Sequence, residues 1–201
     1  MSGFCAWLTA HGTSCLELVA VLFGIAGVWL SIYEKISNWP IGIINVALYA
    51  VLFLQQKLYA NAGLQLFYIG VSVYGWYAWV YAKQTKLVVK HTARASVLPL
   101  VGATLVIWIV LTVATRLAGG TMPLLDSGTT AVSLVAEWML ARKMVENWAV
   151  WIAVDAVYVA MLISDSLYLT AINYAIYFVL AVVGYREWRR LARVGMTEAL
   201  A

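Results

Sequence analysis

Seven long apolar stretches, separated by short polar or basic segments, decide what this chain can fold into. A helix needs about 20 residues to cross the hydrocarbon core of a bilayer, and each stretch approaches that length. A transmembrane β-barrel is excluded, because its strands would alternate apolar and polar residues, whereas Val97–Val113 is apolar on every face. The stretches cover residues 15–33, 39–55, 59–81, 97–117, 123–141, 148–163 and 167–185.

Composition supports the same conclusion. Of the 201 residues, 64% are apolar and only 11% are charged, whereas soluble domains are near half apolar and a quarter charged. Seven spans leave no room for a separate soluble catalytic domain. The sequence therefore predicts one all-α integral membrane domain over residues 1–201, in contact with the lipid bilayer on its outer faces.

The basic residues predict how the spans are oriented, because Lys and Arg near membrane ends favour the cytoplasm. Eleven of the thirteen lie in one set of alternate loops, and the other set holds only Lys57 and Arg116. We expect the N-terminus outside and the C-terminus in the cytoplasm. The first stretch is too long for an ordinary signal peptide and should remain as a span. Because topology accounts for the net charge of +4, no nucleic-acid partner is expected.

Nothing in the sequence predicts a metal ion, a cofactor or ATP coupling. Cys5 and Cys15 form no CxxC pair, and His11 and His91 lie far apart in the sequence. A phosphate-binding GxxxxGK[ST] run is absent. Any accumulation of a solute would then depend on an ion gradient or on metabolic trapping.

An internal repeat organises the chain at a constant offset of 109 positions, which relates Trp29 to Trp138. Its first copy covers 15–81, its second covers 123–188, and 97–117 is left over as an apolar linker helix suited to facing lipid. Two copies of three spans with one span between them predict a 3+1+3 arrangement of parallel repeats, as in SWEET transporters. The other matched residues include Asn38-Trp39 and Asn147-Trp148, Tyr49 and Tyr158, Tyr68 and Tyr177, Gly75 and Gly184, and Trp79 and Trp188.

Polar residues within the spans are costly in lipid and normally face the bundle interior or a water-filled path. Asp126, Thr130, Ser133 and Glu137 recur along one stripe of the fifth span, and Asp155 lies near the middle of the sixth. A stripe of this kind predicts contact with a substrate. The alternatives are helix packing by Thr and Ser, acids that reach solvent, and a protonated, purely structural Asp155.

Amide and aromatic residues mixed on several spans suit an aromatic heterocycle that bears a sugar or alcohol. For the three amides, hydrogen bonding between helices explains their presence equally well. Trp39, Trp79, Trp148 and Trp188 lie near span ends and are expected to anchor the helices at the membrane interface. The candidate substrate-binding residues are Asn45, Tyr49, Gln65, Tyr68, Ser133, Glu137, Trp138, Asp155, Tyr158, Asn173 and Tyr177.

Several motifs resemble those of the PnuC-type nicotinamide riboside transporters, and the resemblance runs from about Leu16 to Arg190. It implies a bacterial inner-membrane transporter whose site lies between the two three-helix units, and whose unphosphorylated vitamin substrate is trapped by a cytoplasmic kinase. Members of the family can be trimeric. The motifs are Asn38-Trp39-Pro40-x-Gly42, Leu58-Tyr59-Ala60, Tyr74-Gly75-Trp76-x-x-Trp79, Glu146-Asn147-Trp148 and Gly184-Tyr185-Arg186-x-Trp188.

The substrate that the resemblance favours is nicotinamide riboside, carried by facilitated diffusion. Relatives carry thiamine or riboflavin, and carboxylates within the membrane suit the cations nicotinamide riboside and thiamine better than neutral riboflavin. Two other classes remain open on the residues alone. One is an intramembrane enzyme that uses Asp126, Glu137 and Asp155 as acids or bases, and the other is a membrane scaffold whose polar residues serve only packing.

Overall fold

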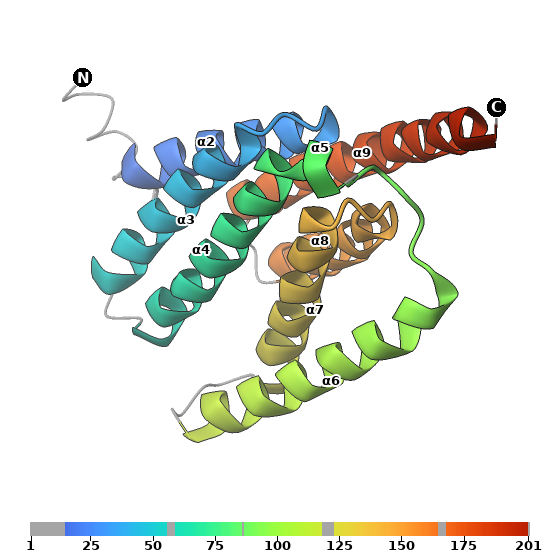
Figure 1. Ribbon diagram of the computed structural model, residues 1–201. Coiled ribbons are helices and arrows are strands. Elements are labelled where there is room, and N and C mark those ends of the chain that lie inside the picture. Colours follow the sequence, from blue (N-terminus) through green and yellow to red (C-terminus); the bar gives the residue numbers. More distant parts are fainter. Residues whose placement is uncertain (1–14, 56–58, 86, 118–122, 165–167, 201) are drawn as a thin grey trace. The chain divides into compact units, whose positions relative to one another are not determined.

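The computed structural model describes residues 15–55, 59–85, 87–117, 123–164 and 168–200. Within them the regular secondary structure is α-helical, apart from an isolated parallel β-bridge between Lys90 and Met144. Seven long helices and one short one follow in order (Figure 1). They are α2 (Cys15–Ile32), α3 (Asn38–Gln55), α4 (Tyr59–Val80), the short α5 (Ala82–Thr85), α6 (Arg94–Leu117), α7 (Pro123–Ala141), α8 (Glu146–Ser164) and α9 (Tyr168–Leu200).

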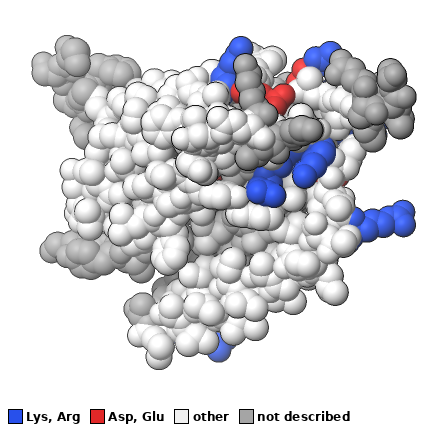
Figure 2. Space-filling view, in the orientation of Figure 1, with Lys and Arg blue, Asp and Glu red and all other residues white. Residues whose placement is uncertain are grey.

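The helices fall into two compact units, Met1–Val73 and Tyr74–Ala201. In the first unit α2 packs against α3. In the second unit α7 packs against both α6 and α8, and α8 also packs against α9. Four helices, α2, α3, α6 and α8, are long and apolar enough to cross a membrane by length and composition. Figure 2 shows a surface on which Lys and Arg are few and separated by broad uncharged areas, as lipid contact requires.

The predicted repeat recurs in the boundaries of the helices. Each of α2, α3 and α4 has a counterpart at the repeat offset in α7, α8 and α9, and corresponding helix starts agree to within one position. The ends of the first two pairs agree in register. Helix α6 lies between the two sets in the chain. The all-α fold with two three-helix repeats and a linker helix is therefore confirmed.

The turns that join the first two helices of each repeat have the same backbone geometry. Glu34 and Lys143 are repeat counterparts with φ angles of 52° and 53°, and no other described non-glycine residue has a positive φ. In each turn the N–H of this residue donates to the carbonyl three positions earlier, at 3.1 Å to Ser31 and 2.9 Å to Leu140. A left-handed residue ends one helix and redirects the chain into the next.

Helix α6 covers α7 and exposes most of its other faces. Gly128 on α7 leaves room for the indole of Trp108, whose Nε1 donates to the carbonyl of Leu124 at 2.9 Å. The remaining circumference carries exposed apolar side chains such as Leu98, Val106 and Ile109. Such a surface is stable only against lipid or another protein, which agrees with the lipid-facing linker predicted for this segment.

The last helix is longer than the apolar stretch that predicted it. The span was expected over 167–185, whereas α9 continues as a single helix to Leu200. Hydropathy marks only the part of a helix that lies in hydrocarbon, and the added turns are amphipathic and rich in arginine.

Candidate functional site

The second unit brings Ser133, Asp155 and Tyr177 to one level. Tyr158 on α8 donates from its hydroxyl to Thr129 Oγ1 on α7 at 3.1 Å, and its ring stacks on Tyr174 of α9 at 4.7 Å. Adjacent helices here run antiparallel, because short connections join them. Moving one turn along α8 from Tyr158 to Asp155 therefore reaches the level of Ser133 on α7 and of Tyr177 on α9.

Asp155 is deeply buried and has no hydrogen-bond or ion-pair partner among the described residues. Its side chain is only 3% exposed, and among the residues the structure describes it makes no hydrogen bond or ion pair. A carboxyl group in such surroundings is costly unless a partner completes it. The first repeat has Val46 at the corresponding position, so the repeat fold itself does not require an acid here.

Three tyrosines of α8 and α9 form an aromatic group near the level of Asp155. Tyr174 stacks on Tyr158 and meets Tyr177 edge-on at 6.1 Å between ring centroids. Tyr158 and Tyr177 are predicted site residues, whereas sequence reasoning missed Tyr174. Tyr174 lies on the span that follows α8 in the sequence. Its closeness to Tyr158 can be inferred only once α8 is known to pack against α9. Stacked and edge-on rings form a surface suited to a planar heterocycle.

Asn173 supplies an amide next to this aromatic group. Its Oδ1 is buried and has no hydrogen-bond partner among the described residues. Since buried polar atoms are nearly always paired, this oxygen is an acceptor available to a ligand or a water molecule. Asn45 in the first unit differs, because its Nδ2 donates to the carbonyl of Ala20 at 2.6 Å. That amide makes the interhelical hydrogen bond that was the alternative to a role in binding.

The other predicted residues of the second unit lie along α7. Glu137 is partly exposed, and Trp138 is 37% exposed with the guanidinium of Arg142 at 6.0 Å from its ring centroid. Ser133 is buried at 5% exposure. Asp126 belongs to α7, but its side chain lies outside the described residues.

In the first unit the remaining predicted residues lie on α3 and α4. Tyr49 is partly exposed and contacts Phe53, with ring centroids 6.1 Å apart. Gln65 and Tyr68 are both partly exposed on α4. Ala20 on α2 and Thr129 on α7 are repeat counterparts. Each accepts a hydrogen bond from the next helix, Ala20 from Asn45 on α3 and Thr129 from Tyr158 on α8.

The four tryptophans near the span ends are not interfacial anchors, so that expectation is wrong. Trp39, Trp79, Trp148 and Trp188 are each at most 2% exposed. In the second unit Trp188 meets Trp148 edge-on at 5.5 Å and Trp79 at 6.4 Å. The close approach of helices that Gly184 permits places these rings in the protein interior.

A second network ties the segment before α6 to the turn between α7 and α8. The carboxylate of Glu146 accepts from the backbone N–H and the hydroxyl of Thr92 at 2.7 and 2.6 Å. The other carboxylate oxygen of Glu146 lies 2.7 Å from His91 Nδ1. Backbone bonds from Lys90 to Lys143 and from Val145 to Lys90 form the isolated bridge. We call these contacts of Lys90, His91 and Thr92 the Glu146 latch.

Comparison with known proteins places these features in a family. Residues 14–190 match the family described as nicotinamide mononucleotide transporter. A nicotinamide riboside transporter of Escherichia coli K12 is 30% identical, over 95% of this chain and 92% of its own. One from Neisseria mucosa is 27% identical over 90% and 74% of the two chains. A riboflavin/roseoflavin transporter of Streptomyces davaonensis is also 27% identical, over 86% and 83%.

A solved structure agrees with the sequence comparisons. The crystal structure of a vitamin B3 transporter superimposes with a TM-score of 0.75 at 27% identity, covering 95% of this chain and 88% of that one. Family and relatives are membrane transporters, which decides between the transporter and the intramembrane enzyme in favour of the transporter. The chain is therefore a multi-pass bacterial membrane protein that belongs to the nicotinamide mononucleotide transporter family.

Proposed function

We propose that this protein carries nicotinamide riboside across the bacterial inner membrane. The observation that carries the proposal is the similarity to nicotinamide riboside transporters along nearly the whole chain, at 30% identity over 95% of its length for the relative from Escherichia coli. The riboflavin/roseoflavin transporter among the relatives makes riboflavin the second candidate. Thiamine, a cation like nicotinamide riboside, is the third.

The chemistry around Asp155 supports a cationic substrate over a neutral one. A buried carboxyl group with no partner among the described residues gains most from a positively charged ring. Beside it the tyrosines at 158, 174 and 177 offer stacking faces, and Asn173 offers an unpaired acceptor for a hydroxyl or amide. We infer that the substrate contacts this group together with Ser133, Glu137 and Trp138, and that Tyr49, Gln65 and Tyr68 contact it as well.

Transport is proposed to be facilitated diffusion. Without a sequence motif for ATP binding, net uptake would follow from phosphorylation of the substrate by a cytoplasmic kinase. The N-terminus is proposed to lie outside. Eleven of the thirteen basic residues lie in the set of loops on the opposite side, and basic loops favour the cytoplasm. We further propose a single transmembrane domain over 1–201 that assembles as a homotrimer.

Uptake into proteoliposomes tests the substrate directly. Labelled nicotinamide riboside should equilibrate across the membrane without ATP or an ion gradient, and unlabelled thiamine and riboflavin should compete weakly. Empty liposomes are the control. Strong competition by riboflavin together with weak competition by nicotinamide riboside would replace the proposed substrate, and an absence of flux for all three vitamins would overturn the proposal.

A further inference from the structure

The C-terminal part of α9 carries four arginines on one side. At 100° per residue, Arg186, Arg189, Arg190 and Arg193 fall within about 100° of the helix circumference. The opposite side holds Gly184, Trp188 and Ala192, all buried. Packing of that buried side therefore fixes the direction in which the arginines point. We call the four residues the Arg stripe.

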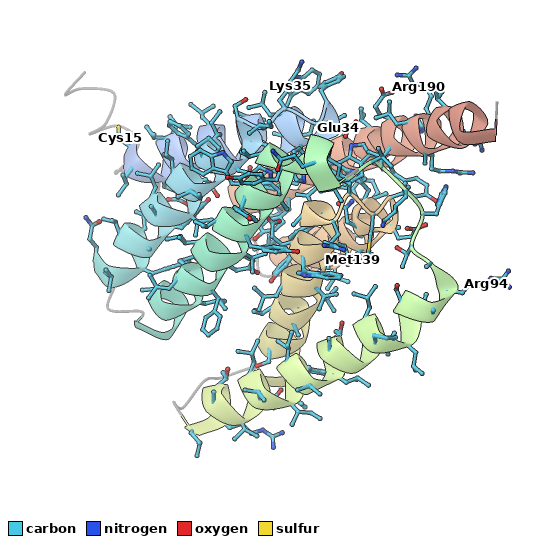
Figure 3. The ribbon with its side chains drawn as sticks, in the orientation of Figure 1. Cys15, Glu34, Lys35, Arg94, Met139 and Arg190 are labelled. Atoms are coloured by element: carbon cyan, nitrogen blue, oxygen red, sulfur yellow. The ribbon has the colours of Figure 1, made fainter. Side chains whose placement is uncertain are left out.

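The Arg stripe surrounds an open hollow. Tyr185 and Val194 line it together with the four arginines, and its volume is about 410 Å³. The guanidinium of Arg189 lies 5.5 Å from the centroid of the Tyr185 ring, a cation–π arrangement that holds the charge against an aromatic surface. Figure 3 labels Arg190, whose side chain points away from the body of α9.

One carboxylate offsets part of this charge. Glu187 accepts from Arg190 Nη2 at 2.6 Å and from Nε at 3.1 Å. These hydrogen bonds lower the pKa of Glu187 below its ordinary value, so it stays ionised. The described side chains that line the hollow include no acid, and Arg186 and Arg189 form no ion pair with a described carboxylate.

The stripe lies where phospholipid headgroups are expected. Helix α9 begins at Tyr168, so Arg186 follows after a rise of about 27 Å, close to the 30 Å thickness of the hydrocarbon core. From Arg186 to Arg193 the helix rises about 10 Å more, which crosses the headgroup layer. Tyr185, at the boundary, is a residue type enriched at that interface.

We propose that the Arg stripe binds the phosphate of an anionic phospholipid in the membrane leaflet next to the end of α9. Four arginine side chains line one open hollow, and guanidinium is the side-chain group that matches phosphate geometry best. The charge complementarity selects anionic over zwitterionic lipid. The bound lipid would then hold the end of α9, and with it the cluster of Trp79, Trp148 and Trp188, against the membrane.

The test measures lipid binding rather than transport, so it does not depend on which vitamin is carried. The purified chain is titrated with phosphatidylglycerol or phosphatidylcholine in mixed micelles, while retained lipid is counted by native mass spectrometry and thermal unfolding is followed. We expect retention of phosphatidylglycerol, a higher unfolding temperature, and loss of both at high salt. Phosphatidylcholine should have neither effect.

Variants locate the binding to the stripe. The triple variant R186Q/R189Q/R193Q should lose affinity at least tenfold, since each surface arginine contributes about fivefold. Arg94→Gln, which removes one arginine charge at the exposed start of α6 (Figure 3), is the matched control for each single variant and should bind as the wild type does. If the triple variant does not fold, Arg186→Gln and Arg189→Gln are measured singly, each with an expected fivefold loss.

Four results would overturn the proposal. The first three are equal retention of phosphatidylglycerol by the wild type and the folded arginine variants, equal binding of phosphatidylcholine, and displacement of the lipid by inorganic phosphate at similar concentration. The third would assign the hollow to free phosphate. A stripe that ignores both lipids and binds an acidic soluble protein would likewise replace the lipid as its occupant.

Discussion

Trp148 lies so close to Gly184 that a Cβ added to the glycine would come within 2.6 Å of the indole ring. Gly184 could not carry even a methyl group without a shift of α8 or α9. The same contact supports the edge-on packing of Trp148 against Trp188. The second and third helices of the second repeat thus meet here with no space for an added methyl group.

Replacing Gly184 by Ala should destabilise the protein by about 1–3 kcal/mol, the usual cost of overpacking a well-filled interior. The measurement is thermal unfolding in detergent. Gly102→Ala is the matched control, because nothing lies within 4 Å of a Cβ at that helical position. The control should be unchanged or slightly more stable, since alanine favours helix over glycine. Equal unfolding temperatures for the two variants would contradict the close contact.

The left-handed residue at Glu34 allows a test of the first turn. Asn adopts positive φ with little strain, whereas a β-branched residue does not. Glu34→Val should therefore be about 1–2 kcal/mol less stable than Glu34→Asn. Comparing the two variants with each other cancels the loss of the carboxylate. Chemical denaturation gives the difference, and the same pair at Lys143 should behave alike if the turns are equivalent.

The repeat was predictable from sequence because matched aromatic and amide residues keep one offset through the whole chain. The bounds of the helices follow it closely, and only α9 extends well beyond its apolar stretch. Spacing could not reveal that Glu34 and Lys143 are left-handed. Neither residue is glycine, and other residues impose the turn on them.

The candidate site was predictable in part. Asp155, Tyr158 and Tyr177 were each predicted as site residues, because polar residues within spans and the repeat can be read directly from the sequence. Tyr174 was missed, since its contact with Tyr158 depends on how two helices pair. The buried tryptophans were assigned to the interface for the same reason. Position in a span indicates depth in the membrane, but it does not indicate which side of the helix meets protein.

The Glu146 latch gives a further prediction, because it joins segments that are distant in the sequence. Glu146→Gln keeps the shape but removes the charge that receives both Thr92 bonds. It should cost about 1 kcal/mol of stability, a modest value because the carboxylate is partly exposed. Glu187→Gln, whose partner lies within its own helix, is the control and should cost less. Hydrogen exchange of the Thr92 amide should accelerate in Glu146→Gln alone, and unchanged exchange there would argue against the latch.

The stacked tyrosines predict an effect on substrate rather than on fold. Tyr174→Leu keeps a large apolar side chain but removes the ring that stacks on Tyr158. Affinity for nicotinamide riboside should fall about two- to tenfold, since an aromatic stacking contact contributes roughly 0.5–1.5 kcal/mol beyond its area. Tyr77→Leu, on the exposed side of α4, is the control. Ligand-induced shifts in unfolding temperature measure both, and equal shifts would place the substrate elsewhere.

Asp155 provides the sharpest test of the proposed site, because its repeat counterpart Val46 shows that the fold accepts an apolar residue at this position. Asp155→Asn and Asp155→Val should both fold, and Val should be at least as stable as the wild type, since a buried carboxyl without a described partner costs free energy. Initial uptake of nicotinamide riboside should fall at least tenfold in both, roughly the 1.5–3 kcal/mol of a hydrogen bond to a charged group. Binding of neutral riboflavin, wherever it is detectable, should not fall with it. A variant that unfolds at the wild-type temperature and transports nicotinamide riboside at the wild-type rate would remove Asp155 from the substrate site.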